Sequence, residues 1–431
     1  MPTYGDFECR FLVFFGAVTL LMGALAPWSY RRYDVTHMAI AQGFLWVGLL
    51  LPLLLLSGQA SWLAPAINLV AIPWLSLLTA PLAVAGAALF FILPSWAVVI
   101  WQLADQSLQP LWWIIETIPD DWGFVSLPLA LSFGVAIALA SVSLSLLLPR
   151  GFPYRGLLPL PFIGLISVPP PLAPLRMTVL DVGQALAVIV ETAEHVLVYD
   201  TGARYSEKLD AGRGIIAPFL RRRGHLSIDL LMISHEDNDH SGGADGLVQS
   251  LPVERILHGP GYRLKPLSAD SADGEICRSS QSWTWDSVSF RVLAPNIDSP
   301  DRGNNSSCVL LITWRGHSIL LPGDIERAGE RALLDDIIFS PPLDVLIAPH
   351  HGSKTSSGSE WVRTLSPEHV VFSAGYQHHF GHPHKRVRER YFSQNSRAWS
   401  TAENGAITFQ WTDSGLQLPA AEHNGFSVRW R

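Results

Sequence analysis

Hydrophobic residues are distributed unevenly along the chain, and two regions with different patterns follow one another. Long, almost uninterrupted apolar runs occupy residues 11–28, 38–57, 62–80, 82–104 and 124–148, and a shorter, proline-broken run occupies residues 152–168. A helix needs about 20 apolar residues to cross the hydrocarbon core of a membrane. We therefore expect residues 1–171 to form an α-helical polytopic membrane region with about six spans.

Prolines interrupt this apolar sequence at Pro73 and Pro81. Proline removes a backbone donor, so each position predicts either an ordinary kink or a discontinuous helix that lines a pathway. Ionisable residues are scarce in the apolar runs, so the sequence gives no indication of a proton relay.

The pattern changes after the stiff linker Val168-Pro169-Pro170-Pro171 to short, β-rich runs. A second domain is expected over residues 172–431, with strands interleaved with helices. This arrangement predicts two sheets flanked by helices. Strands are predicted near residues 177–184, 187–191, 196–200, 229–234, 255–258, 287–293, 307–314, 317–321, 344–348 and 370–374, and helices near residues 210–223, 242–250, 326–335 and 383–394.

Charge divides the chain at the same place. Residues 1–171 contain 5 of the 30 Lys and Arg and 7 of the 37 Asp and Glu, so residues 172–431 have a net charge of about −5. This acidic balance does not indicate a broad nucleic-acid-binding surface. Without a Cys-x-x-Cys pair, a thiolate zinc site is not expected. Cys9, Cys277 and Cys308 are either unrelated thiols, or the last two pair in an oxidising compartment.

Candidate metal ligands follow the ends of predicted strands. His235, Asp237, Asp239 and His240 lie within six residues, directly after the apolar run that ends at Ile233. Imidazole and carboxylate together suit zinc, manganese or iron. Further donors follow later strands or loops and complete a predicted dinuclear site: Asp324, His350, His351 and His382.

These motifs resemble a known superfamily. His-x-Asp-x-Asp-His-x-Gly-Gly, with Leu-Pro-Gly-Asp and Pro-His-His-Gly-Ser downstream, is similar to the metallo-β-lactamase superfamily. The further stretches Asp181-Val182-Gly183-Gln184, Tyr199-Asp200-Thr201-Gly202, Gly381-His382-Pro383-His384 and the membrane residues 64–73 resemble ComEC-type DNA-uptake proteins. The resemblance implies an α/β, αββα sandwich after the membrane region, two divalent metal ions (zinc or manganese), and degradation of one DNA strand while the other crosses the membrane.

The chain departs from this pattern at several points. Asp237 stands where the superfamily commonly has His, and ComEC-type proteins share this Asp. Residues 303–307 contain no His ligand, so we expect one metal to be thinly ligated and Asn304 or Asn305 to shape the site. Family members commonly continue Asp-Val-Gly-Gln with a glycine and an acidic residue, and this chain has Ala185-Leu186 there. We also expect the chain to lack the family's N-terminal soluble domain and some of its spans.

The resemblance assigns a role to each candidate residue. Metal ligands are His235, Asp237, Asp239, His240, Asp324 and one of His350 or His351. Asp239 orients the attacking hydroxide, and His382 is either a ligand or the proton donor to the leaving oxygen. Substrate contacts are assigned to Lys354, Asn304 and Asn305.

Expected partners are DNA, single-stranded or duplex, the membrane, and a DNA receptor and cytoplasmic helicase of the competence machinery. Two other functions stay open at this point. One is a membrane-anchored metal-dependent phosphodiesterase or esterase that acts on a small substrate. The other is a channel fragment whose hydrolase domain is inactive.

Basic loops indicate an orientation in the cytoplasmic membrane. Arg31 and Arg32 follow the first predicted span, and Arg150 and Arg155 precede the last. The positive-inside rule places both pairs in the cytoplasm. With six spans, the hydrolase domain then lies on the outer, periplasmic face.

A reporter that is active only in the periplasm, fused after Arg431, tests this orientation. We expect it to be active in living cells, because an odd number of spans follows the cytoplasmic Arg31-Arg32 loop. A cytoplasmic reporter at the same junction is the control. Activity of the cytoplasmic reporter alone would show that the spans are miscounted.

Overall fold

The computed structural model describes residues 59–118, 124–126, 173–207, 209–262, 274–296, 303–336, 343–417 and 419–421, with isolated residues between 42 and 49 and between 141 and 156. The chain divides into two compact units. Residues before 170 make up nearly all of the first, and residues from 170 onward nearly all of the second. Each unit is described by itself.

In the first unit, a continuous helix follows the short strand β1 (Gln59–Ser61), which pairs antiparallel with β2 (Phe124–Ser126). The helix comprises α3 (Ala64–Trp74), the π-helical segment η2 (Leu75–Thr79) and α4 (Ala80–Phe90). The π-helical turn lies between Pro73 and Pro81, where missing N–H donors interrupt the regular hydrogen-bond ladder. The helix therefore runs through residue 81, and the predicted division of the apolar sequence at that point is wrong.

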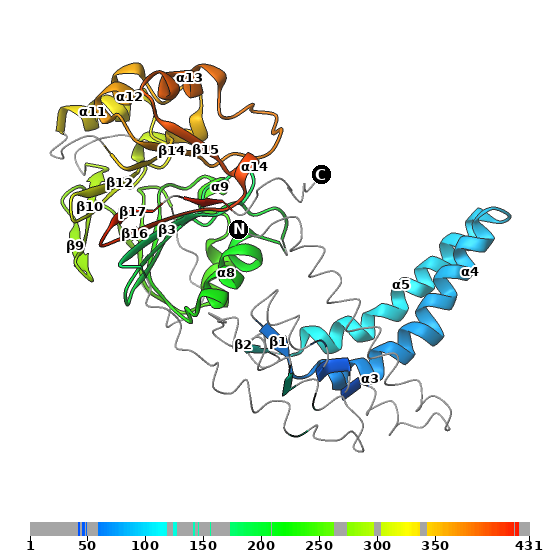
Figure 1. The fold of residues 1–431 in the computed structure, drawn as a ribbon. Coiled ribbons are helices and arrows are strands. Elements are labelled where there is room, and N and C mark those ends of the chain that lie inside the picture. Colours follow the sequence, from blue (N-terminus) through cyan, green and yellow to red (C-terminus); the bar gives the residue numbers. More distant parts are fainter. Residues whose placement is uncertain are drawn as a thin grey trace. The chain divides into compact units, whose positions relative to one another are not determined.

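The next helix, α5 (Pro94–Glu116), begins after a short turn and has proline at its first position, where no donor is lost. It extends beyond residue 104, where the predicted apolar run ends, because apolar residues on either side of Asp105 continue the helical pattern. Figure 1 shows α4 and α5 running side by side as a hairpin. A Cβ on Gly86 would lie 2.5 Å from Trp101 Nε1, so glycine permits this close approach.

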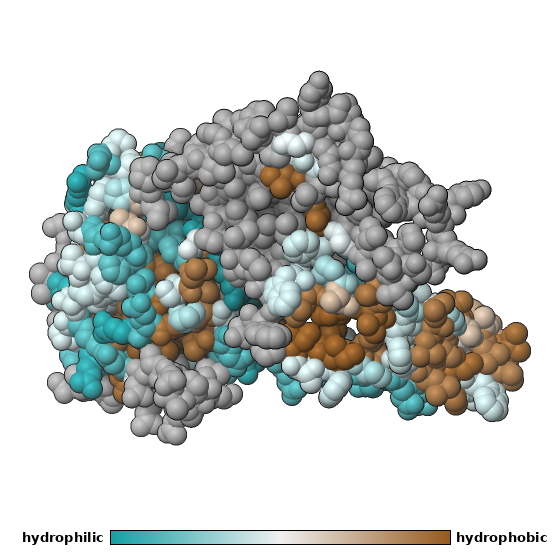
Figure 2. All heavy atoms as spheres, turned by 90° about the horizontal axis from the view of Figure 1, so that it is seen from below, coloured by the Kyte–Doolittle hydropathy of each residue, from teal (hydrophilic) through white to brown (hydrophobic). Residues whose placement is uncertain are grey.

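Among the described residues, one helix, Ala64–Phe90, is long and apolar enough to cross a membrane. The exposed surface of the α4–α5 hairpin is largely hydrophobic, as the right side of Figure 2 shows, and it includes Leu77, Phe91 and Ile92. The predicted spans at residues 11–28, 38–57, 124–148 and 152–168 lie outside the described residues, apart from isolated positions and residues 124–126, which form strand β2 where a helix was predicted. The number of spans stays a prediction.

The second unit contains two sheets. One has the order β17-β16-β3-β4-β5-β6-β7-β8, with β18 beside β16, and the other has the order β15-β14-β13-β12-β11-β10-β9. Their bounds are β3 Leu175–Val179, β4 Val188–Thr192, β5 Val196–Tyr199, β6 Ile228–Ile233, β7 Val253–His258, β8 Gly274–Ile276, β9 Ser282–Trp285, β10 Val288–Ala294, β11 Val309–Trp314, β12 His317–Leu321, β13 Val345–Ile347, β14 His369–Phe372, β15 Arg397–Ser400, β16 Ile407–Thr412, β17 Gly415–Leu416 and β18 Ala420–Ala421.

Alternating side chains distribute the strands' apolar residues between three cores. In β6, Leu230 and Met232 enter the core between the sheets, whereas Leu231 and Ile233 enter a core on the outer face. This follows from the two-residue period of a strand. Helices cover both outer faces, so the layers are helix, sheet, sheet, helix (Figure 1), and the predicted αββα sandwich is confirmed.

Each outer core has its own helices. The first sheet is covered by η4 (Gly212–Ile216), α8 (Ala217–Arg223) and α10 (Ala244–Ser250). The second is covered by α11 (Arg327–Asp336), α12 (Ser359–Leu365) and α13 (Lys385–Ser393). Short helical turns lie between strands: α9 Asn238–Ser241, η5 Gly303–Ser306, η6 Pro349–Gly352 and α14 Thr401–Asn404.

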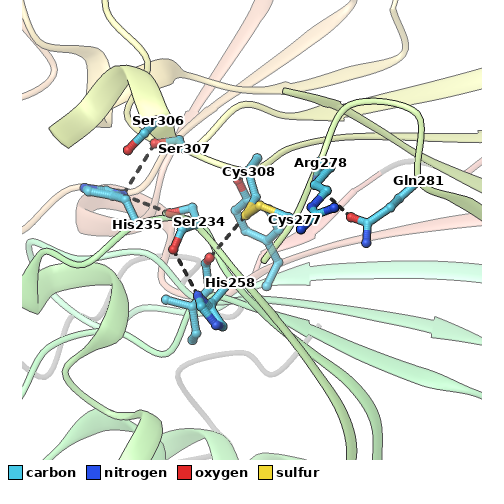
Figure 3. The surroundings of a disulfide bond; sticks show 12 residues. Ser234, His235, His258, Cys277, Arg278, Gln281, Ser306, Ser307 and Cys308 are labelled. Carbon is cyan, nitrogen blue, oxygen red and sulfur yellow. Dashed lines mark hydrogen bonds between the residues drawn. A yellow bond between two sulfur atoms is a disulfide. The ribbon is translucent and has the colours of Figure 1, made fainter. Parts of the chain in front are cut away.

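A disulfide links the two sheets beside the predicted metal loop. Cys277 follows β8, Cys308 precedes β11, and their Cα atoms are 6.0 Å apart. Both cysteines are buried, and the Cys308 N–H donates to Ser234 O at 2.9 Å. Figure 3 shows the bond next to Ser234 and His235. Of the two alternatives for these cysteines, the structure has the bonded one.

Replacing both cysteines by alanine should destabilise the second unit. The bond closes a loop with a sequence separation of 31 residues. The chain-entropy model then gives a loss of about 4 kcal/mol in the free energy of unfolding. The measurement is the thermal midpoint of the full chain in detergent, with Cys9→Ala as control. Finding Cys277 and Cys308 as free thiols after native export, by non-reducing peptide mapping, would contradict the pairing.

Candidate metal centre

The predicted ligands lie at one edge of the sandwich because they follow parallel strands. β5, β6 and β7 are parallel neighbours in one sheet, and β12, β13 and β14 are parallel neighbours in the other. Carboxyl ends of parallel strands meet at the same sheet edge. The loop after β6 carries His235 to His240, the loop after β12 carries Asp324, and η6 after β13 carries His350 and His351.

Four of these residues converge. Asp239, His240, Asp324 and His351 each offer a ligand atom, and these atoms all lie within 4.8 Å of one another. His240 Nε2 is 3.1 Å from Asp324 Oδ1 and 3.2 Å from His351 Nε2, and His351 Nε2 is 3.3 Å from Asp239 Oδ2. Two imidazoles and two carboxylates make a donor set that suits zinc or manganese.

Asp200, at the end of β5, orients His240 from behind. Its Oδ2 accepts a hydrogen bond from His240 Nδ1 at 2.7 Å, and its carboxylate also accepts from Ser234 N and Oγ at 2.6 and 2.8 Å. All three residues are buried. Since Nδ1 is the donor, the Nε2 lone pair of His240 faces the other three ligands. A carboxylate behind a ligating histidine is a common feature of metal sites.

His351 is oriented in the same way by the backbone. Its Nδ1 donates to Ser373 O at 2.7 Å, so its Nε2 also faces the group. Ser373 is itself fixed by a hydrogen bond from its Oγ to Ala185 O at 2.6 Å. Two Nε2 atoms 3.2 Å apart repel unless a proton or a cation lies between them. This arrangement favours a bound cation.

The side chains of the four-donor group are charged although most of them are buried, and their pKa values are shifted accordingly. Burial by itself raises the pKa of Asp324, but the charges of His240 and His351 hold it well below its usual value. Burial likewise raises the pKa of Asp239, but its hydrogen bond with His351 and the charge of His240 hold it at about 2. Burial lowers the pKa of His240, and the charges of Asp324 and Asp200 raise it well above its usual value. Both carboxylates are therefore ionised, as metal ligation would require.

His235 and Asp237 form a second, thinner group beside the first. His235 is buried, and its ring centroid lies 4.2 Å from that of His240. Its Nε2 has no hydrogen-bond partner, and Asp237 Oδ2 lies 3.5 Å away, too far for a strong hydrogen bond. An orphaned buried nitrogen fits a metal ligand. These residues would provide fewer donors than the first group.

His350 and His351 are adjacent but have different surroundings. Both have left-handed backbone conformations, with φ of 49° and 54°, which turn consecutive side chains in different directions. His350 Nε2 is 3.8 Å from Asp324 Oδ2, and its Nδ1 lies 3.1 Å from Thr355 Oγ1 and 3.3 Å from Glu326 Oε1. The four-donor group therefore includes His351, and His350 lies at its margin.

His382 approaches the group with a defined tautomer. Gln184 Oε1 accepts from Gly375 N at 3.1 Å, so the Gln184 amide nitrogen faces His382 Nδ1, also at 3.1 Å. Nδ1 is therefore an acceptor, and Nε2 carries the hydrogen of the neutral ring. Burial and the nearby charges of His351 and His350 lower the pKa of His382 to about 4. This geometry favours a neutral hydrogen-bond donor over a ligand.

The three predicted substrate contacts differ in position. Asn305 Oδ1 accepts from Glu326 N at 2.9 Å and Gly329 N at 3.2 Å, so this side chain holds the start of α11. Asn304 uses its backbone oxygen to hold Ser307, whose Oγ in turn accepts from Asp324 N at 3.1 Å. Lys354 is exposed. The side chain of Asn305 is therefore engaged, whereas those of exposed Lys354 and half-buried Asn304 are available to meet a substrate.

Glycine permits the close packing of these loops. A Cβ on Gly323, whose φ is +59°, would lie 2.8 Å from the Ser307 side chain. A Cβ on Gly243 would lie 2.2 Å from Thr201 O. The Gly-Asp and His-x-Gly-Gly motifs therefore bring Asp324 and His240 to the site at distances that a side chain would prevent.

Sequence reasoning did not name Asp200, Gln184 or Ser373 as site residues, although two of them lie in quoted motifs. Asp200 hydrogen-bonds to the predicted ligand His240, and Gln184 hydrogen-bonds to the candidate catalytic residue His382. Neither residue was itself a candidate for binding the metal or the substrate. Their motifs, Tyr199-Asp200-Thr201-Gly202 and Asp181-Val182-Gly183-Gln184, were the available signal. Nothing in the local sequence distinguishes Ser373, which contributes its backbone oxygen to His351.

Comparison with known proteins agrees with this geometry. Residues 180–376 match the metallo-beta-lactamase superfamily, and residues 7–151 match the family described as Competence protein. The chain joins a competence-protein domain to a metallo-beta-lactamase domain. The pairing confirms the predicted resemblance to ComEC-type proteins. Together with the four-donor group, it supports a metal-dependent hydrolase.

Curated relatives share both parts. The chain is 32% identical to Competence protein ComA of Neisseria gonorrhoeae over 92% of its own length, and 28% identical to ComE operon protein 3 of Bacillus subtilis (strain 168) over 95%. It is 30% identical to Uncharacterized protein YcaI of Escherichia coli (strain K12) over 84%. It covers 54%, 56% and 48% of these proteins, respectively, so it spans about half of their length.

Asp200→Asn should weaken metal binding. The substitution removes the charge that orients His240, and loss of such a partner costs about 10- to 100-fold in metal affinity. Competition for Zn²⁺ between the full chain and a chelating dye measures the effect. Asp229→Asn is the matched control, because Asp229 also accepts a short backbone hydrogen bond, from Val196 N, and makes no hydrogen bond with a predicted ligand among the described residues. Unchanged affinity in Asp200→Asn would contradict the role.

Proposed function

We propose that the second unit is a metal-dependent nuclease that acts in DNA uptake across the cytoplasmic membrane. The four-donor group of Asp239, His240, Asp324 and His351 carries this proposal, since it lies in a metallo-beta-lactamase domain joined to a competence-protein domain. The relatives named as competence proteins support DNA as the substrate. One strand is degraded while the other passes through the membrane.

Two divalent ions, zinc or manganese, are proposed as cofactors. His240, His351, Asp324 and Asp239 would hold one ion, and His235 and Asp237 would contribute to holding the other. Such ions lower the pKa of a bound water and stabilise charge that develops on a phosphoryl group. The thinner second group is consistent with the lack of a histidine in η5 (Gly303–Ser306).

Side chains around the ions complete the proposed chemistry. Asp239 is ionised and partly exposed, so it can accept a hydrogen bond from the attacking water and orient it. His382 presents a neutral Nε2–H, which can donate to a phosphate or leaving-group oxygen. Proton donation by an imidazolium is not favoured, because the pKa of His382 is about 4. Lys354 is proposed to contact substrate phosphate.

The proposed location is the outer face of the cytoplasmic membrane, with several spans in the first unit. The buried disulfide between Cys277 and Cys308 supports this placement, because structural disulfides persist in oxidising compartments. Proposed partners are DNA, a DNA receptor outside the membrane and a helicase in the cytoplasm. A small phosphodiester is the other candidate substrate, since the second unit has a net charge of about −5.

Asp239→Ala should abolish cleavage of a single-stranded oligonucleotide and leave the fold intact, because Asp239 contributes a ligand atom but packs no core. Removing metal with a chelator should have the same effect, and adding Zn²⁺ or Mn²⁺ back should restore cleavage. Asp413→Ala is the control, since Asp413 is an exposed partner of Arg315. The mechanism fails if a well-folded, metal-free preparation keeps full activity.

A further inference from the structure

A cavity of about 380 Å³ in the second unit is lined almost entirely by cationic or ionisable basic side chains. Its lining residues are Arg327, Lys354, His384, Arg386, Val387 and Arg390. No Asp or Glu is among them. An adjoining cavity of about 250 Å³ shares Arg327 and Arg390, adds Arg331, and is also lined by Glu330 and Glu360. This concentration of positive charge contrasts with the net negative charge of residues 172–431.

The cations in the cavity are only partly engaged within the protein. Arg327 donates to Lys354 O at 3.1 Å and Arg390 donates to Ser357 O at 2.7 Å, both neutral acceptors. Lys354 and Arg386 are exposed, and no side-chain partner is recorded for either among the described residues. Buried Glu330 accepts from the backbone N–H groups of Gly358 and Ser357, and its charge also interacts with those of Arg327 and Arg390. The charges of exposed Lys354 and Arg386 are thus the ones directed at solvent.

The start of α13 adds further positive charge next to the cavity, and this charge lowers the stability of the helix. Its first turn contains Lys385, Arg386 and Arg388 and no acidic residue. Cations near a helix N-terminus oppose the helix dipole and destabilise the helix. A sequence that breaks this local rule without an internal partner for Arg386 indicates a functional role for the charge. An anion at this position would meet the dipole and the side chains together.

Short connections join the cavity to the metal centre. Lys354 is on the loop that follows His350 and His351, and Thr355 Oγ1 lies 3.1 Å from His350 Nδ1. On the other wall, His384 is two residues after His382, and its N–H donates to Gly352 O at 2.9 Å. One loop, residues 350–355, therefore carries both His351 of the four-donor group and Lys354 of the cavity.

We propose that this basic cavity binds a backbone phosphate of the polynucleotide strand next to the scissile bond. The inference rests on the proposed function, and it makes the substrate a polymer. A nucleic-acid strand has one phosphate per nucleotide, so a strand with one phosphate at the ligands presents others close by. A small phosphodiester has no second phosphate to fill the cavity. Binding here depends on charge and not on base sequence.

Lys354→Gln with Arg386→Gln tests the cavity in the full chain in detergent. Both side chains are exposed and without recorded partners, so the fold should persist. We measure affinity for a fluorescein-labelled single-stranded oligothymidylate in EDTA over a range of salt. Affinity should fall roughly tenfold, as expected for lost charge-assisted contacts. The magnitude of the salt slope of log affinity should fall by about 0.7, the value for one phosphate contact on a single strand.

Arg278→Gln with Arg363→Gln is the matched control, because it removes the same charge from exposed positions outside the cavity. An equal loss of affinity in this control would show general charge attraction and overturn the proposal. So would unchanged affinity in the cavity variant. Cleavage of the same oligonucleotide by the metal-loaded wild type is scored separately. Binding as expected without any cleavage would leave the cavity assignment standing and remove the nuclease function.

Discussion

The hydrogen bond between Asp200 Oδ2 and His240 Nδ1 is the contact on which the geometry of the metal centre depends. At 2.7 Å and in a fully buried position, it fixes which nitrogen of His240 faces the ligands. The same carboxylate accepts from Ser234 at the end of β6, so one residue ties the ends of two adjacent strands together. Without the Asp200 hydrogen bond, the His240 ring would be free to rotate, and its Nε2 would no longer be held 3.2 Å from His351 Nε2.

The sandwich makes this contact possible because both sheets end at the same edge. Tyr199, at the end of β5, donates to Cys308 O at 2.6 Å and approaches Leu321 O at 3.2 Å, so it connects the sheets directly beneath the ligands. The disulfide at Cys277 and Cys308 strengthens the same region. Ligands on loops are usually mobile, but here each loop begins at a buried strand that core packing holds in place.

The two binding roles proposed for this unit, for metal ions and for phosphate, fall in regions of opposite charge. At the metal centre, buried carboxylates are balanced by histidines only, which suits cations. A few residues further along the same loops, Lys354 and Arg386 are exposed and have no side-chain partner within the described part of the chain, which suits phosphate. An acidic protein can therefore attract a polyanion locally, because screening limits charge effects to about 10 Å at moderate salt. Net charge alone is a poor guide to the substrate of such a unit.

The sequence by itself determined the fold class, the family and the loops that carry the ligands. Apolar runs and strand periodicity depend on local residues, and the donors follow strand ends directly, as at His235 and Asp324. Only the tertiary structure brought His351 rather than His350 to the group, assigned Asp200 to His240, and placed Asn305 at the start of α11. These outcomes depend on contacts between distant residues: His240 and His351 are 111 residues apart. Sheet pairing and loop conformation set such contacts, and spacing along the chain does not encode them.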